Sequence, residues 1–297
     1  MPIQLQLLQV HSLHFPSVCS SSSNPSSSAY TPPLPSSSHS HSPSLSFTSG
    51  RHPPLLRFRT SYRENLRYLR TLGIISNREV PSPETLQSIL SIINFFKSKG
   101  FSESDFRRLY FLRPQLFSPS LDPADFAPVF EFLATEVAAS PAESCALILR
   151  CPGILLSHVD LCLRRTLLFL RELGLEKLNL PTSLNAHLLN TRVDKLEAKI
   201  RFLQSLDFSR EEAARACSRL PAIFGYSIEN NMRPKFKYLV KEMERDIQEL
   251  KEFPQYFAFS LEKRIIPRHL HLKERNVRIP LQMMLLWNDE KFYTKWK

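Results

Sequence analysis

The sequence is poor in glycine and lacks the loops with which glycine-rich motifs hold nucleotide phosphates. Only six of its 297 residues are glycine, and neither GxGxxG nor GxxxxGK[ST] occurs. None of the five cysteines forms a CxxC pair or lies at a zinc-ligand spacing from a histidine. No apolar run approaches the roughly 20 residues of a membrane-spanning helix. We therefore expect no cofactor, no metal site, no disulfide framework and no membrane span.

Charged residues are missing from the first 50 positions. This segment contains 17 serines and no Asp, Glu, Lys or Arg. Such a composition buries too little apolar surface to offset the entropy of ordering the chain, and it is typical of an organellar transit peptide. Because mitochondrial presequences are usually rich in arginine, we predict a chloroplast transit peptide over residues 1–55. A mitochondrial presequence and an ordinary disordered tail are the alternatives.

The remainder of the chain is basic, and its excess of positive charge grows toward the C-terminus. Residues 51–140 carry 12 basic and 9 acidic residues, whereas residues 141–297 carry 27 and 19. The formal net charge of the whole chain is +11. A graded basic surface suggests a polyanionic partner, although a helical protein can also be basic without one.

A proline recurs inside four apolar segments that align with one another. The segments are LRPQLFSPSLD from Leu112, RCPGILLSHVD from Arg150, RLPAIFGYSIE from Arg219 and EFPQYFAFSLE from Glu252. Their prolines, Pro114, Pro152, Pro221 and Pro254, are 38, 69 and 33 residues apart. The middle gap holds two periods, so a copy without the proline is expected near residue 187. Because proline has no N–H and clashes inside a helix, each should end one helix before the next begins.

Helix signals flank each proline with the same spacing. Capping boxes or weaker copies of them at Ser102, Ser140 and Ser209 predict the start of a first helix in each repeat. After the proline, a short 3₁₀ connector should lead to a second helix, which in one copy begins at Ser157 or Asp160 and ends at Gly174. Apolar residues at i, i+4 and i+7 mark the buried stripe of each second helix. The stripes are Phe126/Phe130/Leu133, Leu163/Leu167/Leu170, Leu196/Ile200/Leu203 and Met232/Phe236/Leu239.

These patterns predict an all-α, helical-repeat solenoid over residues 62–297. About six repeats of about 30 to 38 residues would each bury one stripe by stacking on their neighbours. An earlier helix should run from Ser82-Pro83 to Lys99-Gly100. The terminal WNDEKFYTKWK is predicted to form a capping helix, with stacking of its aromatic residues on bases as the alternative. His269 and His271 are predicted to be surface residues, and the acidic pairs Asp122/Asp125 and Glu211/Glu212 to stabilise helix starts.

The repeat resembles that of the mitochondrial transcription termination factor (mTERF) family. The resemblance rests on PGILL, PAIFG, PQYFA and PQLFS together and covers roughly Glu84 to Ser260. It implies a left-handed α-superhelix that binds nucleic acid along a basic concave groove, in a plant organellar protein that is not an enzyme. The implied function is transcription termination or regulation. The alternatives are RNA binding in rRNA maturation, ribosome assembly or intron splicing. The missing proline near residue 187 predicts a less regular groove there.

Basic residues recur beside the prolines and at the starts of the second helices. Lysine and arginine supply affinity for nucleic acid by neutralising phosphates, whereas a solvated helix face is the alternative for any one of them. The candidate binding residues are Arg113, Arg150, Arg164, Arg165, Lys195, Lys199, Arg219, Arg233, Lys235, Lys237, Lys263, Arg264 and Arg268. The expected partners are double-stranded DNA and/or RNA, with organellar transcription or ribosome-assembly proteins as further partners of a monomer. A protein-binding scaffold would explain the repeat but not the charge.

Overall fold

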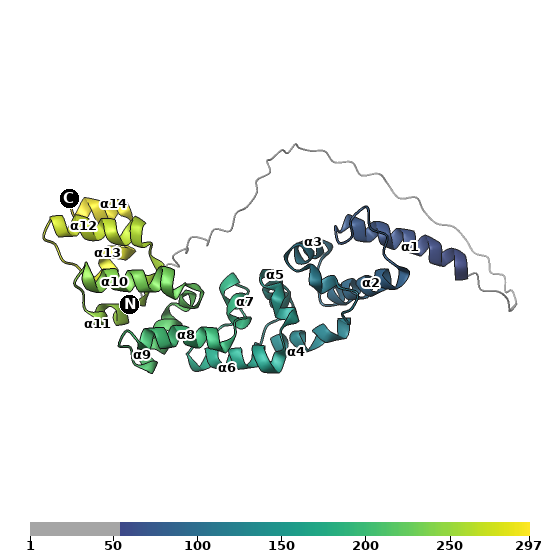
Figure 1. The fold of residues 1–297 in the computed structure, drawn as a ribbon, viewed down its shortest axis with the longest axis horizontal. Coiled ribbons are helices and arrows are strands. Elements are labelled where there is room, and N and C mark those ends of the chain that lie inside the picture. Colours follow the sequence, from purple (N-terminus) through teal and green to yellow (C-terminus); the bar gives the residue numbers. More distant parts are fainter. Residues whose placement is uncertain (1–53) are drawn as a thin grey trace, which may run out of the picture. The chain divides into compact units, whose positions relative to one another are not determined.

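The computed structural model describes residues 54–297, with side chains from residue 61 onward, and this part of the chain consists of helices and their connectors (Figure 1). The predicted all-α class is therefore confirmed. Almost all of the predicted transit peptide lies outside the described residues. None of the helices in the described range combines the length and the apolar character needed to cross a membrane.

Short first helices alternate with second helices along the chain. The α-helices are α1 (Pro54–Thr71), α2 (Pro83–Ser98), α3 (Glu103–Leu112), α4 (Ala127–Thr135), α5 (Pro141–Arg150), α6 (Arg164–Glu172), α7 (Ser183–Leu189), α8 (Val193–Gln204), α9 (Arg210–Arg219), α10 (Arg233–Lys241), α11 (Ile247–Glu252), α12 (Ile266–Glu274), α13 (Leu281–Leu286) and α14 (Asp289–Lys295). The 3₁₀ helices are η1 (Pro114–Phe117), η2 (Pro123–Phe126), η3 (Pro152–Leu156), η5 (Pro221–Gly225) and η7 (Pro254–Ala258). One-turn π-helices are η4 (Val159–Leu163), η6 (Ile228–Met232) and η8 (Leu261–Ile265).

The first helices begin at the predicted capping residues. Ser140 Oγ accepts a hydrogen bond from the Glu143 N–H at 3.3 Å, while Ser140 N–H donates to the Glu143 carboxylate at 2.8 Å. Ser209 and Glu212 repeat this exchange at 3.1 and 2.8 Å. Each pair satisfies two backbone donors that the start of a helix leaves without partners. The same chemistry at Ser102, whose N–H donates to Asp105 at 2.8 Å, begins α3.

Each recurring proline ends a first helix and begins a 3₁₀ turn, as predicted. The residues before the four prolines, Arg113, Cys151, Leu220 and Phe253, have φ between −151° and −130° and ψ between 67° and 77°. These angles lie outside the helical region, from which the proline ring excludes the preceding residue. The first helix must therefore stop there. The 3₁₀ turn that begins with the proline, which we call the proline tag, directs the chain toward the second helix.

After three of the tags, the second helix begins with a π turn whose capping residue lies six residues beyond the proline. Ser227 Oγ and Ser260 Oγ each accept a hydrogen bond from the N–H three residues later, at 3.1 Å. His158 Nδ1 occupies the equivalent place and accepts from Leu161 N–H at 3.3 Å. The prediction that Ser157 or Asp160 begins this helix is therefore wrong. Gly174, with φ of +78°, ends the helix as predicted, because glycine adopts this left-handed conformation without strain.

The repeat near residue 187 has a simpler connector. Its helices α7 and α8 are joined by Asn190, Thr191 and Arg192, where the other repeats have a proline tag followed by a further 3₁₀ or π turn. Loss of the proline thus coincides with loss of the whole tag. The buried stripe is kept, since Leu196, Ile200 and Leu203 are all fully buried.

The predicted stripes form the core. All their residues are buried except Phe236, which is half-buried against the same cluster. Cys145, Cys151 and Cys217 are buried as free thiols, and Cys162 is half-buried. Burial raises the pKa of the Cys217 thiol to about 12, which keeps it protonated and apolar at neutral pH.

The terminal helix α14 packs as predicted for a cap, because Phe292 is fully buried beside His271. The prediction that His269 and His271 are surface residues is wrong. His269 Nδ1 lies 2.8 Å from the Tyr238 hydroxyl, and His271 Nε2 lies 2.5 Å from the Trp296 carbonyl oxygen. Both rings are half-buried because α12 is covered by aromatic residues from α10 on one side and from α14 on the other.

Candidate nucleic-acid interface

The connectors between first and second helices contact one another along the chain. A Cβ atom on Gly153 in η3 would lie 2.9 Å from Asn190 Nδ2 and 3.8 Å from Arg113 Nη2. Asn190 also accepts a hydrogen bond from Ser157 Oγ at 2.6 Å. Farther along, α7 contacts η5, and η5 contacts η7. We call this series of connectors, from Arg113 to Ala258, the connector row. The first helices end at the connector row, and the second helices begin there.

Seven of the thirteen candidate residues are exposed and have no ion pair within residues 61–297. They are Arg113, Arg150, Arg165, Lys195, Arg219, Lys237 and Lys263. Arg113, Arg150 and Arg219 lie at the connector row, where the first helices end. The other four lie on second helices. These seven charges are free to meet an anionic ligand.

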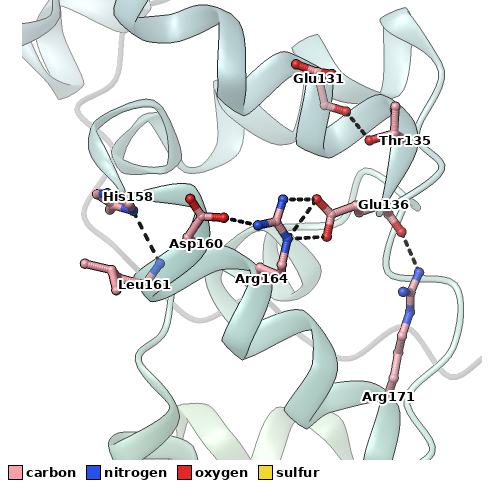
Figure 2. Close-up of polar contacts among 8 residues, drawn as sticks. All are labelled: Glu131, Thr135, Glu136, His158, Asp160, Leu161, Arg164 and Arg171. Carbon is pink, nitrogen blue, oxygen red and sulfur yellow. Dashed lines mark hydrogen bonds and ion pairs between the residues drawn. The ribbon is translucent and has the colours of Figure 1, made fainter.

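Besides the buried Arg268, two candidates are already paired with carboxylates. The Arg164 guanidinium lies between Glu136 and Asp160 (Figure 2). Its Nε donates to the two Glu136 oxygens at 3.1 and 2.9 Å, and its Nη2 donates at 2.6 Å. These bonds lower the pKa of Glu136 and raise that of Arg164. Because Glu136 follows α4, the pair joins neighbouring second helices, and Arg171 adds a bond of 2.5 Å to the Glu136 carbonyl oxygen.

The second paired candidate repeats part of this arrangement. Arg233 donates to both oxygens of Glu229 at 2.8 and 2.9 Å. Arg233 and Glu229 each lie 69 residues after Arg164 and Asp160, the spacing that also separates Pro152 from Pro221. Carboxylates of the protein therefore partly neutralise both arginines. Exposed pairs of this kind are nevertheless weak, and an anionic ligand can replace the carboxylate.

The structure contradicts the placement of Lys235 and Arg268 on an exposed stripe. Lys235 is 5% exposed, and its Nζ donates to the Phe257 carbonyl oxygen at 2.7 Å and to Asn231 Oδ1 at 3.0 Å. Arg268 is 1% exposed and donates to the Met284 carbonyl oxygen at 2.6 Å and to Asp289 at 2.5 Å. Both side chains point from a second helix into the following repeat, so neither reaches a ligand.

The last two candidates are half-buried. Arg264 Nη2 donates to the Trp287 carbonyl oxygen at 2.5 Å, and its guanidinium lies over the Phe259 ring. Burial lowers the pKa of Lys199. Packing therefore accounts for four of the thirteen candidates: Lys199, Lys235, Arg264 and Arg268.

The candidates also do not form the regular once-per-repeat line that the sequence suggested. Arg113 directly precedes its proline, whereas Arg150 and Arg219 stand two residues before theirs. Arg113 is thus the counterpart of buried Cys151. Arg201 was missed, although it is exposed and lies 36 residues before Lys237, as Leu196 lies before Met232. Arg192, exposed in the connector between α7 and α8, was missed because that connector lacks the proline that marks the others.

Comparison with known proteins identifies the class to which this fold belongs. The mTERF family model matches residues 141–293, just over half of the chain. The chain therefore belongs to the mTERF family, as its repeat predicted. The match begins at the helix that Ser140 caps and ends inside α14.

Among individual proteins, the chain is 40% identical over 98 residues to "Transcription termination factor MTERF2, chloroplastic" of Arabidopsis thaliana. It is 31% identical over 98 residues to "Transcription termination factor MTERF4, chloroplastic" of Zea mays. These matches cover 33% of this chain in each case, but only 15% and 20% of the two relatives. The chain thus matches no more than a fifth of either relative. Their chloroplastic names support the predicted chloroplast localisation.

Proposed function

We propose that the chain binds nucleic acid through the exposed basic residues of successive repeats and thereby regulates chloroplast transcription, including its termination. The observation that carries this proposal is the set of seven exposed arginines and lysines, from Arg113 to Lys263, that form no ion pair within residues 61–297. Charges distributed over several repeats suit an extended polyanion better than a small ligand. The names of the relatives, which are transcription termination factors, support the process.

The ligand is double-stranded DNA or RNA, since phosphate contacts are common to both. Binding to a structured RNA would favour the alternative roles in rRNA maturation, ribosome assembly or splicing. For the same number of phosphate contacts, affinity depends more steeply on salt for duplex DNA, with a slope of about −0.9 per contact in log K against log salt, than for single strands, with about −0.7.

The test compares two sets of five exposed basic residues that have no ion pairs. The binding set changes Arg150, Arg165, Lys195, Arg219 and Lys237 to glutamine, and the control set changes Arg78, Lys177, Arg215, Lys241 and Lys273. Both variants lose the same net charge. If all five residues of the binding set contact phosphates, its variant should flatten the duplex slope by about 4.5, and the control variant should change it much less. Fluorescence anisotropy across a salt series measures both.

Equal losses in the two variants would show that net charge alone, and not these positions, attracts the ligand. No binding of DNA or RNA at low salt by the unmodified chain would overturn the proposal and favour a protein-binding scaffold. One feature of the second helix formed by η4 and α6 supports that second candidate function. Leu161 and Leu168, seven residues apart on one helical face, are 58% and 53% exposed.

A further inference from the structure

One position in the second helices carries a polar side chain toward the following repeat. It lies three residues after the first buried residue of the second helix, which is Leu163, Leu196 or Met232 in three of the stripes and Ile265 in the last repeat. The residues at this position are Thr166, Lys199, Lys235 and Arg268, in the same order. Thr166, Lys235 and Arg268 are three of the five buried polar or charged residues among the side chains that the structure describes. A shared repeat position, rather than chance, therefore places them in the interior.

The three buried side chains make the same kind of contact. Thr166 Oγ1 donates to the Thr191 carbonyl oxygen at 2.8 Å, Lys235 Nζ to that of Phe257 at 2.7 Å, and Arg268 Nη1 to that of Met284 at 2.6 Å. Every acceptor is a backbone carbonyl oxygen of the next repeat. A hydroxyl, an ammonium and a guanidinium thus each donate a hydrogen bond to a backbone carbonyl oxygen, although the side chains differ in length and charge.

The acceptors lie in similar places, either in the last turn of the first helix of the next repeat or in the connector that follows it. Thr191 is in the connector between α7 and α8, Phe257 is in the tag η7, and Met284 is in the last turn of α13. The last four carbonyl oxygens of a helix have no partner within that helix. Met284 is one of these residues in α13, whereas Thr191 and Phe257 lie in connectors, and in all three cases a donor from the preceding repeat satisfies the carbonyl oxygen.

Burying a charged donor at this position is costly, so the contact must supply something that packing does not. Transfer of a lysine ammonium out of water is unfavourable, and burial lowers the pKa of Lys235 to about 8. The equivalent residue of α4 is the buried Val129, so an apolar residue fits the position. Apolar contacts fix the distance between two helices but are non-directional, whereas a hydrogen bond to a carbonyl group requires one orientation.

We propose that Thr166, Lys235 and Arg268 are positioning residues, each of which fixes the orientation of its own repeat on the next. The stack is thereby held by one directional bond at each of these joints in addition to its apolar core. This role does not depend on nucleic acid, and its test contains none. Failure of the proposed nucleic-acid binding would therefore leave it standing.

Hydrogen exchange of the full chain, read peptide by peptide by mass spectrometry, tests the joint at Lys235. Lys235→Met keeps most of the side-chain volume but removes the donor. Exchange in peptides that cover α11 and η7 should accelerate about tenfold, as expected for loss of a hydrogen bond to a charged group. Lys235→Arg should retain protection, because Arg268 performs this role at the same position. Lys237→Met, on the exposed side of the same helix, is the matched control.

Thr166→Val repeats the test with a smaller change, in case Lys235→Met does not fold. It preserves the shape of the side chain and should accelerate exchange about threefold in peptides that cover α7 and its connector. Thr135→Val, which removes a hydroxyl bonded within its own helix, is the control and should leave those peptides unchanged. Acceleration spread evenly over all repeats, unchanged exchange at both joints, or exchange as fast in Lys235→Arg as in Lys235→Met would overturn the proposal.

Discussion

A buried lysine must either lose its proton or have polar partners. Lys235 has two hydrogen-bond acceptors, and its pKa is also lowered. Its ammonium is bonded to the Phe257 carbonyl oxygen and Asn231 Oδ1. The ring of Tyr226 lies 5.8 Å from Nζ. The nearby Glu262 carboxylate only partly offsets the desolvation that lowers its pKa. The residue therefore binds fewer protons in the folded chain than in the unfolded chain over an alkaline range of pH.

This difference predicts a pH dependence of stability. Between pH 8, the pKa of Lys235 in the folded chain, and its ordinary value of 10.5, the unfolded state carries the extra proton. The contribution of Lys235 to the free energy of unfolding should therefore rise with pH across this window, by at most about 1.4 kcal/mol per pH unit. Below pH 8 both states are protonated and the contribution should be flat.

Urea unfolding of the wild type and of Lys235→Met at pH 7, 8, 9 and 9.5 measures this contribution as a difference. Other groups that titrate in this range cancel, because both proteins contain them. Lys237→Met, changed at an exposed site of α10, controls for loss of a positive charge. Parallel stability curves for the wild type and Lys235→Met would show that Lys235 does not titrate as its burial requires.

At the scale of elements, local chemistry made the helix boundaries largely predictable from the sequence. Capping residues and prolines act within three or four residues of themselves, so Ser140, Ser209 and the four tags could be placed without tertiary information. The start at His158 was not predicted, because a histidine rarely caps a helix and the serine beside it bonds to Asn190 of the next repeat instead.

The orientation of basic side chains was harder to predict than the helices that carry them. Lys235 and Arg268 were assigned to an exposed stripe because they are charged. Their spacing already indicated otherwise, since a residue at i+3 shares the face of the buried residues at i, i+4 and i+7. The helical register therefore predicted the burial of Lys235 and Arg268 better than their charge did. The acceptors on the following repeat could not be predicted, because the sequence does not show which backbone carbonyl groups lie within reach of a side chain once two repeats are stacked.

The elements predict a ranking of two substitutions. Pro221→Ala removes a helix stop and frees the unfolded chain, and it should cost about 1 kcal/mol of stability. Leu203→Ala empties a fully buried site in the stripe of α8 and should cost about 2–5 kcal/mol. Thermal melts of the two variants provide the comparison. A larger loss for Pro221→Ala would mean that the tag, rather than the stripe, carries the packing energy of the repeat.

At the scale of the whole molecule, the repeat architecture extends beyond the region matched by the family. The match begins at residue 141, but η1 starts at Pro114, and Arg113 before it has the same non-helical backbone as Cys151, Leu220 and Phe253. A capped first helix and a buried second-helix stripe flank this earlier tag as well. Because each repeat buries its stripe against neighbours, the earlier helices provide the surface on which the matched region is stacked.

Charged residues are confined to the part of the chain after residue 50, and this asymmetry predicts where the protein is delivered. All 39 basic and 28 acidic residues follow position 50, and the serine-rich segment before them has neither. A fluorescent protein fused after residues 1–60 should therefore enter chloroplasts, because a serine-rich segment without acidic residues is typical of an organellar transit peptide. Residues 61–297 fused to the same reporter serve as the control and should stay outside. Fluorescence of the first fusion in mitochondria would replace the chloroplast assignment with its alternative, and fluorescence left in the cytosol would contradict both.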